Sequence, residues 1–277
     1  MNIQLIAFDL DGTVLRDDKT ISPRTLSALR EAVSRGIQIV PATGRFEKMV
    51  PKEVLCLPGI RYLLTCNGAR VVDLSNQSVI YSRTMTLPDA LKLVRFLVSR
   101  GYFVEAYCAG VSYADSTALP ALHAAGLPEE FFRYIDASQT FVDDLLSFLE
   151  RQGKPIEKFN IPYVPAEERE RLKKEILALG PYSITSSGLI NLEINDAAAN
   201  KGDGLLNLCK KLGVGMESVM AFGDGDNDRN MLKAAGLGIA MGNAEPEIQR
   251  DADAVTATNE EDGVACAIEK YILSQNG

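Results

Sequence analysis

The stretch Ile3-Gln4-Leu5-Ile6-Ala7-Phe8-Asp9-Leu10-Asp11-Gly12-Thr13 decides the fold that this chain is expected to adopt. Its apolar half predicts a buried parallel strand, and Gly12 supplies the turn signal that ends it. Side chains two positions apart point to the same side of a strand, so the carboxylates of Asp9 and Asp11 should converge beyond its carboxyl end. Open α/β sheets bind their ligands in the crevice at that end.

The two carboxylates of Asp9 and Asp11 would repel each other unless a cation or a shared proton joins them. The pair therefore indicates either a Mg²⁺ site or two acids that share one proton. Taken alone, the same residues fit an ordinary acidic turn after a strand equally well. The rest of the chain has to decide between these interpretations.

The first part of the chain alternates between expected strands and helices. Ser22 and Pro23 predict a helix start, and Gly36 follows that helix. Strands are expected over residues 3–8, 37–40 and 62–65, with helices over 22–35 and 46–55. This order predicts a doubly wound, Rossmann-like parallel sheet.

A long insert interrupts this pattern. Residues 84–187 predict an α+β domain with a partly antiparallel sheet, and the alternation of strands and helices resumes behind it. We therefore expect an α/β protein with a discontinuous core, residues 1–83 and 188–277, and an inserted domain, residues 84–187.

Composition excludes several classes of protein. The chain has 277 residues and a formal net charge of -8, which argues against nucleic acid or an anionic membrane as its partner. Its start lacks a basic region, and no apolar run is long enough to span a bilayer, so neither a signal peptide nor a membrane anchor is expected. Five scattered cysteines and the single His123 indicate a cytoplasmic protein without a His/Cys zinc site. Oligomeric state cannot be inferred from the sequence.

Four segments place polar groups at the ends of expected strands or at helix starts. They are Asp9–Thr13, Thr43–Arg45, Lys201 and Asp224–Asp228. Each has an ordinary interpretation: Thr43 suits a helix cap, and an isolated lysine is usually a solvated surface residue. The last segment lacks the spacing of a Ca²⁺ loop, and no P-loop motif is present.

Together the four segments fit phosphoryl transfer. That reaction needs a nucleophile, a cation beside the phosphate, and donors around its oxygens. A carboxylate can serve as the nucleophile, and Mg²⁺ prefers oxygen ligands such as Asp9 and Asp224. A threonine hydroxyl and a lysine ammonium suit the phosphate oxygens.

The order D-x-D-G-T, T-G-R, K and G-D-x-x-N-D resembles the haloacid dehalogenase superfamily of phosphatases. The insert resembles, in position and length, the cap of the Cof-type subfamily IIB. Asn67-Gly68-Ala69 and the tail motifs A-M-G-N-A and N-E-E-D-G-V also resemble that subfamily. The chain departs from the family before Lys201, where Asn195–Asn200 replaces the usual glycine and small residue.

The resemblance implies a role for each candidate residue. Asp9 would be the nucleophile, and Asp11 the general acid and then the base. The metal residues would be Asp9, Asp11 through its backbone carbonyl, Asp224, and Asp228 as a water-mediated ligand or an anchor. The phosphate would be held by the Leu10 backbone N–H, Thr43, Gly44, Lys201 and Asn227. Arg45 would reach the phosphate or the leaving group, with a surface position an equal alternative.

We therefore expect a Mg²⁺-dependent phosphatase that hydrolyses small phosphate monoesters, sugar phosphates or phosphorylated cofactors, through an aspartyl-phosphate. The alternatives are a sugar phosphomutase, a phospho-acceptor signalling module and a non-catalytic phosphate-ligand-binding protein. The second aspartate disfavours a dehalogenase. The substrate cannot be read from the sequence: among Tyr107, Tyr113, Asn160 and Asn191 of the insert, core or surface roles are favoured over substrate contact.

Overall fold

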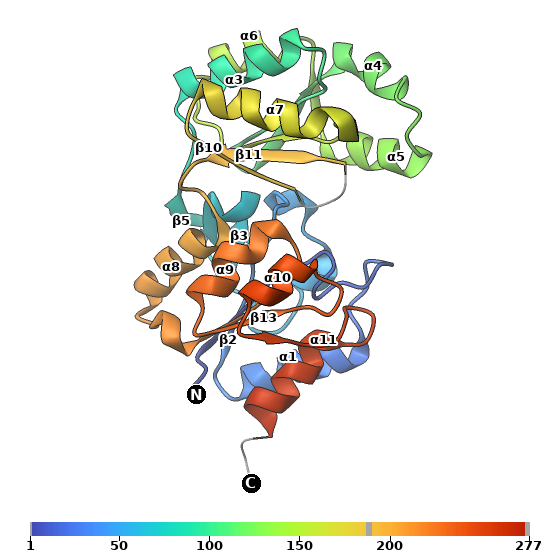
Figure 1. Ribbon diagram of the computed structural model, residues 1–277. Helices are drawn as coiled ribbons and strands as arrows, with labels where there is room; N and C mark the ends of the chain where they lie inside the picture. Colours follow the sequence, from blue (N-terminus) through green and yellow to red (C-terminus); the bar gives the residue numbers. More distant parts are fainter. Residues whose placement is uncertain (1, 187–189, 275–277) are drawn as a thin grey trace. The chain divides into compact units, whose positions relative to one another are not determined.

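The computed structural model describes residues 2–186 and 190–274 (Figure 1). The chain folds into two compact units. The first consists of Met1–Arg45, Val50–Ser82 and Asn200–Gly277, and the second of Phe46–Met49 and Arg83–Ala199.

The first unit contains a five-stranded parallel sheet with the strand order β14-β13-β12-β1-β2. Its strands are β1 (Leu5–Phe8), β2 (Gln38–Pro41), β12 (Val219–Gly223), β13 (Leu237–Ala240) and β14 (Ala254–Val255). The chain runs outward in one direction from β1 to β2 and in the other from β12 to β14, so the topology switches between β1 and β12. The expected doubly wound parallel sheet is confirmed, and ligands bind such sheets at that switch.

Helices cover both faces of this sheet. They are α1 (Pro23–Ser34), α2 (Lys52–Leu55), α8 (Lys201–Leu212), α9 (Arg229–Ala234), α10 (Pro246–Asp251) and α11 (Gly263–Ile268). Ile6 and Phe8 of β1 belong to the apolar cluster that includes α1 and α11, whereas Leu5 and Ala7 belong to the cluster with α8 and α9 (Figure 1). Both faces of β1 are thus buried, which explains its unbroken apolar sequence.

The third expected strand lies outside the parallel ladder. β3 (Tyr62–Thr65) pairs antiparallel with β4 (Arg70–Asp73), which pairs with β5 (Ser78–Ser82). One parallel bridge, Ala42 to Leu64, links it to β2. Successive backbone N–H groups along β2 point in turn toward β1 and toward β3. The Thr43 N–H donates to the Leu64 carbonyl of β3, so the residue two positions earlier, at 41, should also donate toward β3. Pro41 has no N–H, which limits this pairing.

The second unit is built around a six-stranded sheet with the order β10-β11-β9-β6-β7-β8, antiparallel except between β7 and β8. Its strands are β6 (Glu105–Cys108), β7 (Val111–Asp115), β8 (Thr140–Val142), β9 (Lys158–Ile161), β10 (Tyr182–Thr185) and β11 (Leu192–Asp196). Its helices are α3 (Leu87–Ser99), α4 (Leu119–His123), α5 (Glu129–Ser138), α6 (Leu145–Gln152) and α7 (Ala166–Leu179). Helices α3, α6 and α7 cover one face of this sheet (Figure 1).

Two expectations about element limits need correction. Residues 192–196 were expected in the first unit, but β11 pairs with β9 and β10, so the second unit extends to Ala199. The helix expected over 46–55 is instead a 3₁₀ turn, Glu47–Met49, followed by the short helix α2. Pro51 precedes α2 and separates the two pieces because proline cannot continue a helix.

The insert residues named from the sequence have partners within the second unit. The Tyr107 hydroxyl and the Asn160 amide both donate to the buried Glu105 carboxylate at 2.7 Å. Asn191 donates to Asn160 at 3.3 Å, and Tyr113 packs on Phe148 with 4.6 Å between ring centroids. These contacts fit the favoured core roles.

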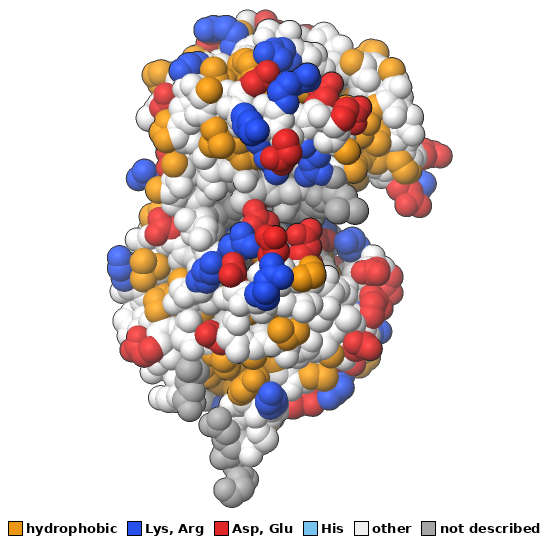
Figure 2. Space-filling model, in the orientation of Figure 1, with side chains coloured by type: hydrophobic (Ala, Val, Ile, Leu, Met, Phe, Trp, Pro, Cys, Tyr) orange, Lys and Arg blue, Asp and Glu red, His pale blue; other side chains and the backbone are white. Residues whose placement is uncertain are grey.

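Three further features concern membrane-spanning helices, cysteines and surface charge. Among the described residues, no helix has both the length and the apolar character needed to cross a bilayer. All five cysteines are free thiols. On the face shown in Figure 2, acidic and basic side chains of the described residues are interspersed.

Candidate active site

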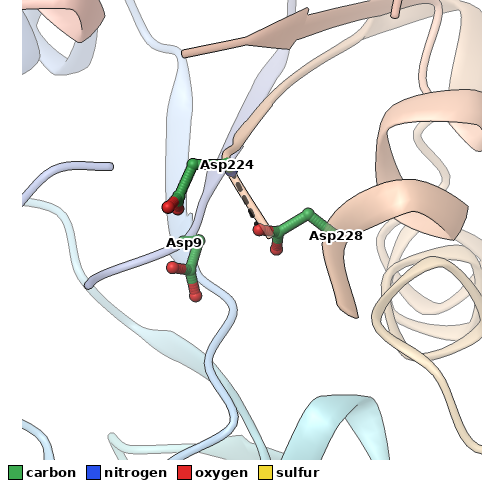
Figure 3. A group of neighbouring side chains, drawn as sticks. All are labelled: Asp9, Asp224 and Asp228. Carbon is green, nitrogen blue, oxygen red and sulfur yellow. Dashed lines mark hydrogen bonds between the residues drawn. The ribbon is translucent and has the colours of Figure 1, made fainter. Parts of the chain in front are cut away.

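Three aspartates meet at the switch edge of the parallel sheet. Asp9 follows β1, and Asp224 and Asp228 lie in the loop after β12 (Figure 3). One carboxylate oxygen from each lies within 4.8 Å of the others. The register explains this meeting, because Phe8 pairs with Phe222 and the Asp9 N–H donates to the Phe222 carbonyl at 3.0 Å.

Lys201 holds this group together from the first position of α8. Its side chain is fully buried, and Nζ donates to Asp9 Oδ1 at 2.5 Å and to Asp228 Oδ1 at 2.6 Å. Burial alone would lower the pKa of Lys201, but the charges of Asp228 and Asp9 outweigh it and raise the pKa. Lys201 is therefore an ammonium, not the solvated surface lysine of the ordinary interpretation.

The site carries an uncompensated negative charge. Burial raises the pKa of Asp9 well above its usual value, and the carboxylates of Asp228 and Asp224 add to this effect against the attraction of Lys201. Burial and Asp228 also raise the pKa of Asp224 to about 7. When all three carboxylates are ionised beside one ammonium, two negative charges remain, which one divalent cation would balance. Oxygen donors are also the ligands that Mg²⁺ prefers, so this donor set fits the metal.

Asp228 differs from the other two aspartates in its hydrogen bonds. Its Oδ1 accepts from Lys201, and its Oδ2 accepts from the backbone N–H groups of Asp224 and Gly225, each at 3.0 Å (Figure 3). Both oxygens are thus engaged with protein donors. Of the two roles left open for Asp228, this geometry favours the anchor that shapes the loop after β12.

Asp224 is held from the first motif. Thr13 Oγ1 donates to Asp224 Oδ1 at 2.8 Å. Gly12 has φ +75°, and a Cβ added there would lie 2.3 Å from Asp224 Oδ2. The glycine and the threonine of D-x-D-G-T are therefore required for the approach of the first motif to the last.

The carboxylate of Asp11 lies outside the aspartate group and binds two basic side chains instead. Arg45 donates to both of its oxygens at 2.7 Å, and Lys19 donates to Oδ1 at 2.9 Å. Burial would raise the pKa of Asp11, but Arg45 and then Lys19 lower it to about 2. The expected convergence of the Asp9 and Asp11 carboxylates needs correction, because the bidentate Arg45 holds Asp11 apart. Arg45 itself is neither a free surface residue nor placed on the acidic group.

The remaining expected phosphate residues are buried within the first unit. Leu10 and Gly44 are buried, and Thr43 Oγ1 accepts from the Arg45 backbone N–H at 3.1 Å. Asn227 is also buried, and its Nδ2 donates to Asn67 Oδ1 at 3.1 Å. The four expected segments thus all lie within the first unit.

Several residues of the site carried no assigned role from the sequence. Lys19 gave no signal, since one lysine in a polar loop is unremarkable in any sequence. Asn243 donates to the Gly12 carbonyl at 2.8 Å, and Asn259 donates to the Leu15 carbonyl at 3.2 Å. Both asparagines belong to the tail motifs of the sequence, but only the structure shows that they bind the loop that follows Asp11.

Comparison with known proteins adds to this geometry. The family model described as haloacid dehalogenase-like hydrolase matches residues 6–268. The 5-amino-6-(5-phospho-D-ribitylamino)uracil phosphatase of Bacillus subtilis is 34% identical over 273 residues, 99% of this chain and 97% of that protein. The pyridoxal phosphate phosphatase of Escherichia coli is 28% identical over 99% of this chain and all of its own length.

A solved structure of a protein with the same family description is also similar to this chain. A haloacid dehalogenase-like hydrolase from B. subtilis superposes with a TM-score of 0.85 at 29% identity, covering 98% of this chain and 100% of its own. The similarity therefore extends through both units.

Proposed function

We propose that this chain, which belongs to the haloacid dehalogenase-like hydrolases and is a phosphatase of that family, hydrolyses small phosphate monoesters with Mg²⁺ through an aspartyl-phosphate on Asp9. The match of the family model to residues 6–268 confirms the family resemblance that the sequence motifs indicated. The observation that carries the proposal is the buried contact of Lys201 with Asp9 and Asp228 beside Asp224, at the switch edge of the sheet.

The metal would be held by Asp9 and Asp224, with the backbone carbonyl of Asp11 as the family resemblance implies. When bound, Mg²⁺ supplies positive charge that draws the phosphate to Asp9 and offsets the charge of the transition state. Asp228 acts by holding the Asp224 backbone and Lys201, as its hydrogen bonds indicate.

The reaction is a double displacement on phosphorus. An Asp9 carboxylate oxygen forms a bond to phosphorus while the ester P–O bond breaks. Asp11, which must first leave Arg45 and take up a proton, gives that proton to the departing alkoxide. Asp11 then takes a proton from water, whose oxygen attacks the phosphorus, and inorganic phosphate leaves with Asp9 restored. Lys201, Asn227 and the Thr43–Gly44 turn hold the phosphate oxygens during both steps.

For the substrate we propose a small phosphorylated metabolite that carries a sugar-like or ring-bearing alcohol. Relatives named 5-amino-6-(5-phospho-D-ribitylamino)uracil phosphatase and pyridoxal phosphate phosphatase support this class. Those two compounds and simple sugar phosphates are the first to test. The second unit would select among them, and the cytoplasm is the location we propose.

Removal of the metal is expected to lower the turnover of p-nitrophenyl phosphate by at least about 100-fold, because two buried negative charges would then repel the substrate phosphate. The measurement is phosphate release by the full chain with Mg²⁺, after treatment with EDTA, and after Mg²⁺ is restored. EDTA already saturated with Mg²⁺ is the control. Undiminished turnover in EDTA would refute the metal requirement, and isomerised sugar phosphate in place of free phosphate would favour a phosphomutase.

Asp11→Asn is expected to lower kcat by about 10²- to 10⁴-fold for an alkyl phosphate, because the amide cannot protonate the leaving alkoxide. With p-nitrophenyl phosphate, whose leaving group departs without a proton, the first step should persist while the water step is slow. Rapid mixing should then show one p-nitrophenolate released per enzyme, followed by slow turnover. The absence of such a burst, with equal losses for both substrates, would contradict the assigned role.

A further inference from the structure

The segment Cys66–Gly68 after β3 adopts three successive left-handed backbone conformations. Its φ angles are 51° at Cys66, 57° at Asn67 and 81° at Gly68. For residues with a Cβ this conformation is unfavourable, and it persists only where the surroundings impose it. The whole segment is buried, so neighbouring residues hold it in this conformation.

The backbone of the segment is bonded to the turn that carries the expected phosphate donors. The Cys66 N–H donates to the Arg45 carbonyl, and the Asn67 N–H donates to the Thr43 carbonyl, both at 3.0 Å. The left-handed conformations direct these two successive N–H groups at the same turn. The Thr43–Arg45 turn therefore takes its position from Cys66 and Asn67.

The same segment packs against the start of α8. A Cβ added to Gly68 would lie 2.3 Å from the Asn200 carbonyl oxygen and 3.0 Å from Lys201 Cα. A Cβ on Gly204 would lie 2.9 Å from the Gly68 carbonyl oxygen. These backbone contacts leave no room for a shift of the segment relative to Lys201.

The Asn67 side chain reaches the third part of the site. Its Oδ1 accepts a hydrogen bond from Asn227 Nδ2 at 3.1 Å, and both residues are buried. The side-chain amide of Asn227 can rotate by half a turn, which exchanges its oxygen and its NH₂ group. An acceptor at the position of Asn67 Oδ1 favours the orientation in which the NH₂ group faces Asn67. One N–H of Asn227 is directed at Asn67, and the other is then oriented by it.

We infer that Asn67 is a positioning residue, which sets the orientation of the Asn227 amide and joins it to the Thr43–Arg45 turn so that both meet one phosphate group. This inference rests on the proposed function, because it assigns phosphate binding to Asn227. Asn67 itself does not touch the phosphate. Its left-handed backbone is the means by which one residue bonds Thr43 with its N–H and Asn227 with its side chain.

The test is Asn67→Gly, because glycine retains the left-handed backbone while the Oδ1 acceptor is lost. Loss of one buried hydrogen bond predicts a decrease of roughly tenfold in kcat/KM for p-nitrophenyl phosphate, and a similar increase in the inhibition constant of inorganic phosphate. Gln77→Gly is the matched control, since Gln77 also has a positive φ, 58°, but lies exposed in the turn between β4 and β5. It should leave both constants unchanged.

A double-mutant cycle separates positioning from general stability. In an Asn227→Ala background, Asn67→Gly should change kcat/KM by less than about twofold, because its target is already absent. Equal losses in both backgrounds, or no loss in the otherwise native chain, would overturn the inference while the proposed function stands. If the native chain hydrolyses no phosphate ester, the proposed function fails instead, and calorimetric affinity for inorganic phosphate gives the same comparison of variants.

Discussion

Asp9→Asn is expected to lower kcat for p-nitrophenyl phosphate by at least about 10⁴-fold, the largest effect that we foresee for a single substitution. The amide oxygen is a poor nucleophile, so no phosphoryl group can be taken up by the side chain. Steady-state phosphate release measures the loss. Acid quench of the native enzyme during turnover should trap phosphate on the protein, and the variant should trap none.

The matched control for this substitution is Asp226→Asn. Asp226 lies exposed in the loop between Asp224 and Asp228, so the change alters net charge equally without touching the buried group. It should retain turnover close to that of the native chain. Stability should not fall in Asp9→Asn, because Lys201 keeps its ion pair with Asp228 and the repulsion among the three neighbouring carboxylates is reduced. Equal turnover by the native chain and Asp9→Asn would refute the nucleophile assignment.

Lys201→Met is expected to lower both stability and activity. Methionine occupies a similar volume, but it leaves Asp9 and Asp228 buried without their shared cation. Removal of one partner from a buried ion pair typically costs about 3–5 kcal/mol, so the free energy of unfolding of the first unit should fall by that order. Turnover should also fall steeply, because the substrate phosphate loses the positive charge that Lys201 is proposed to supply.

Urea unfolding followed by circular dichroism measures the stability change, and phosphate release measures the activity. Lys210→Met is the control, because Lys210 lies exposed on the same helix α8. Its substitution should change the free energy of unfolding by less than about 0.5 kcal/mol. A Lys201→Met protein as stable and as active as the native chain would show that the buried ammonium has no essential role.

The local patterns of the sequence were enough for the parts of the site that depend on neighbours in the chain. The apolar run before Asp9 predicts β1, and Lys201 is expected at a helix start, which is the first position of α8. These features are set within a few residues, by side-chain alternation and by the need to satisfy free helix ends. The position of Asp9 and of Lys201 at the sheet edge follows from them.

The pairings between distant segments were not accessible in this way. The antiparallel partners of β11, which extend the second unit to Ala199, depend on which free strand edge the segment meets. The contact of Asp11 with Arg45 likewise depends on how closely two loops approach, and the expected meeting of the Asp9 and Asp11 carboxylates failed for that reason. Side-chain alternation along a strand predicts the direction in which a carboxylate points, but it does not predict which charged group lies beside that carboxylate.

The sequence by itself determined the class of fold, the order of the four polar segments and the residue types that they bring to the edge of the sheet. Only the tertiary structure decided that Lys201 bridges Asp9 and Asp228, that Arg45 binds Asp11, and that Asn227 donates to Asn67. Periodicity, capping and turn signals depend on residues that are close in the chain, so they can be recognised in a short stretch of sequence. The buried hydrogen bond between Asn67 and Asn227 joins residues 160 positions apart. No local sequence pattern predicts it, because it depends on how all the elements between the two residues pack.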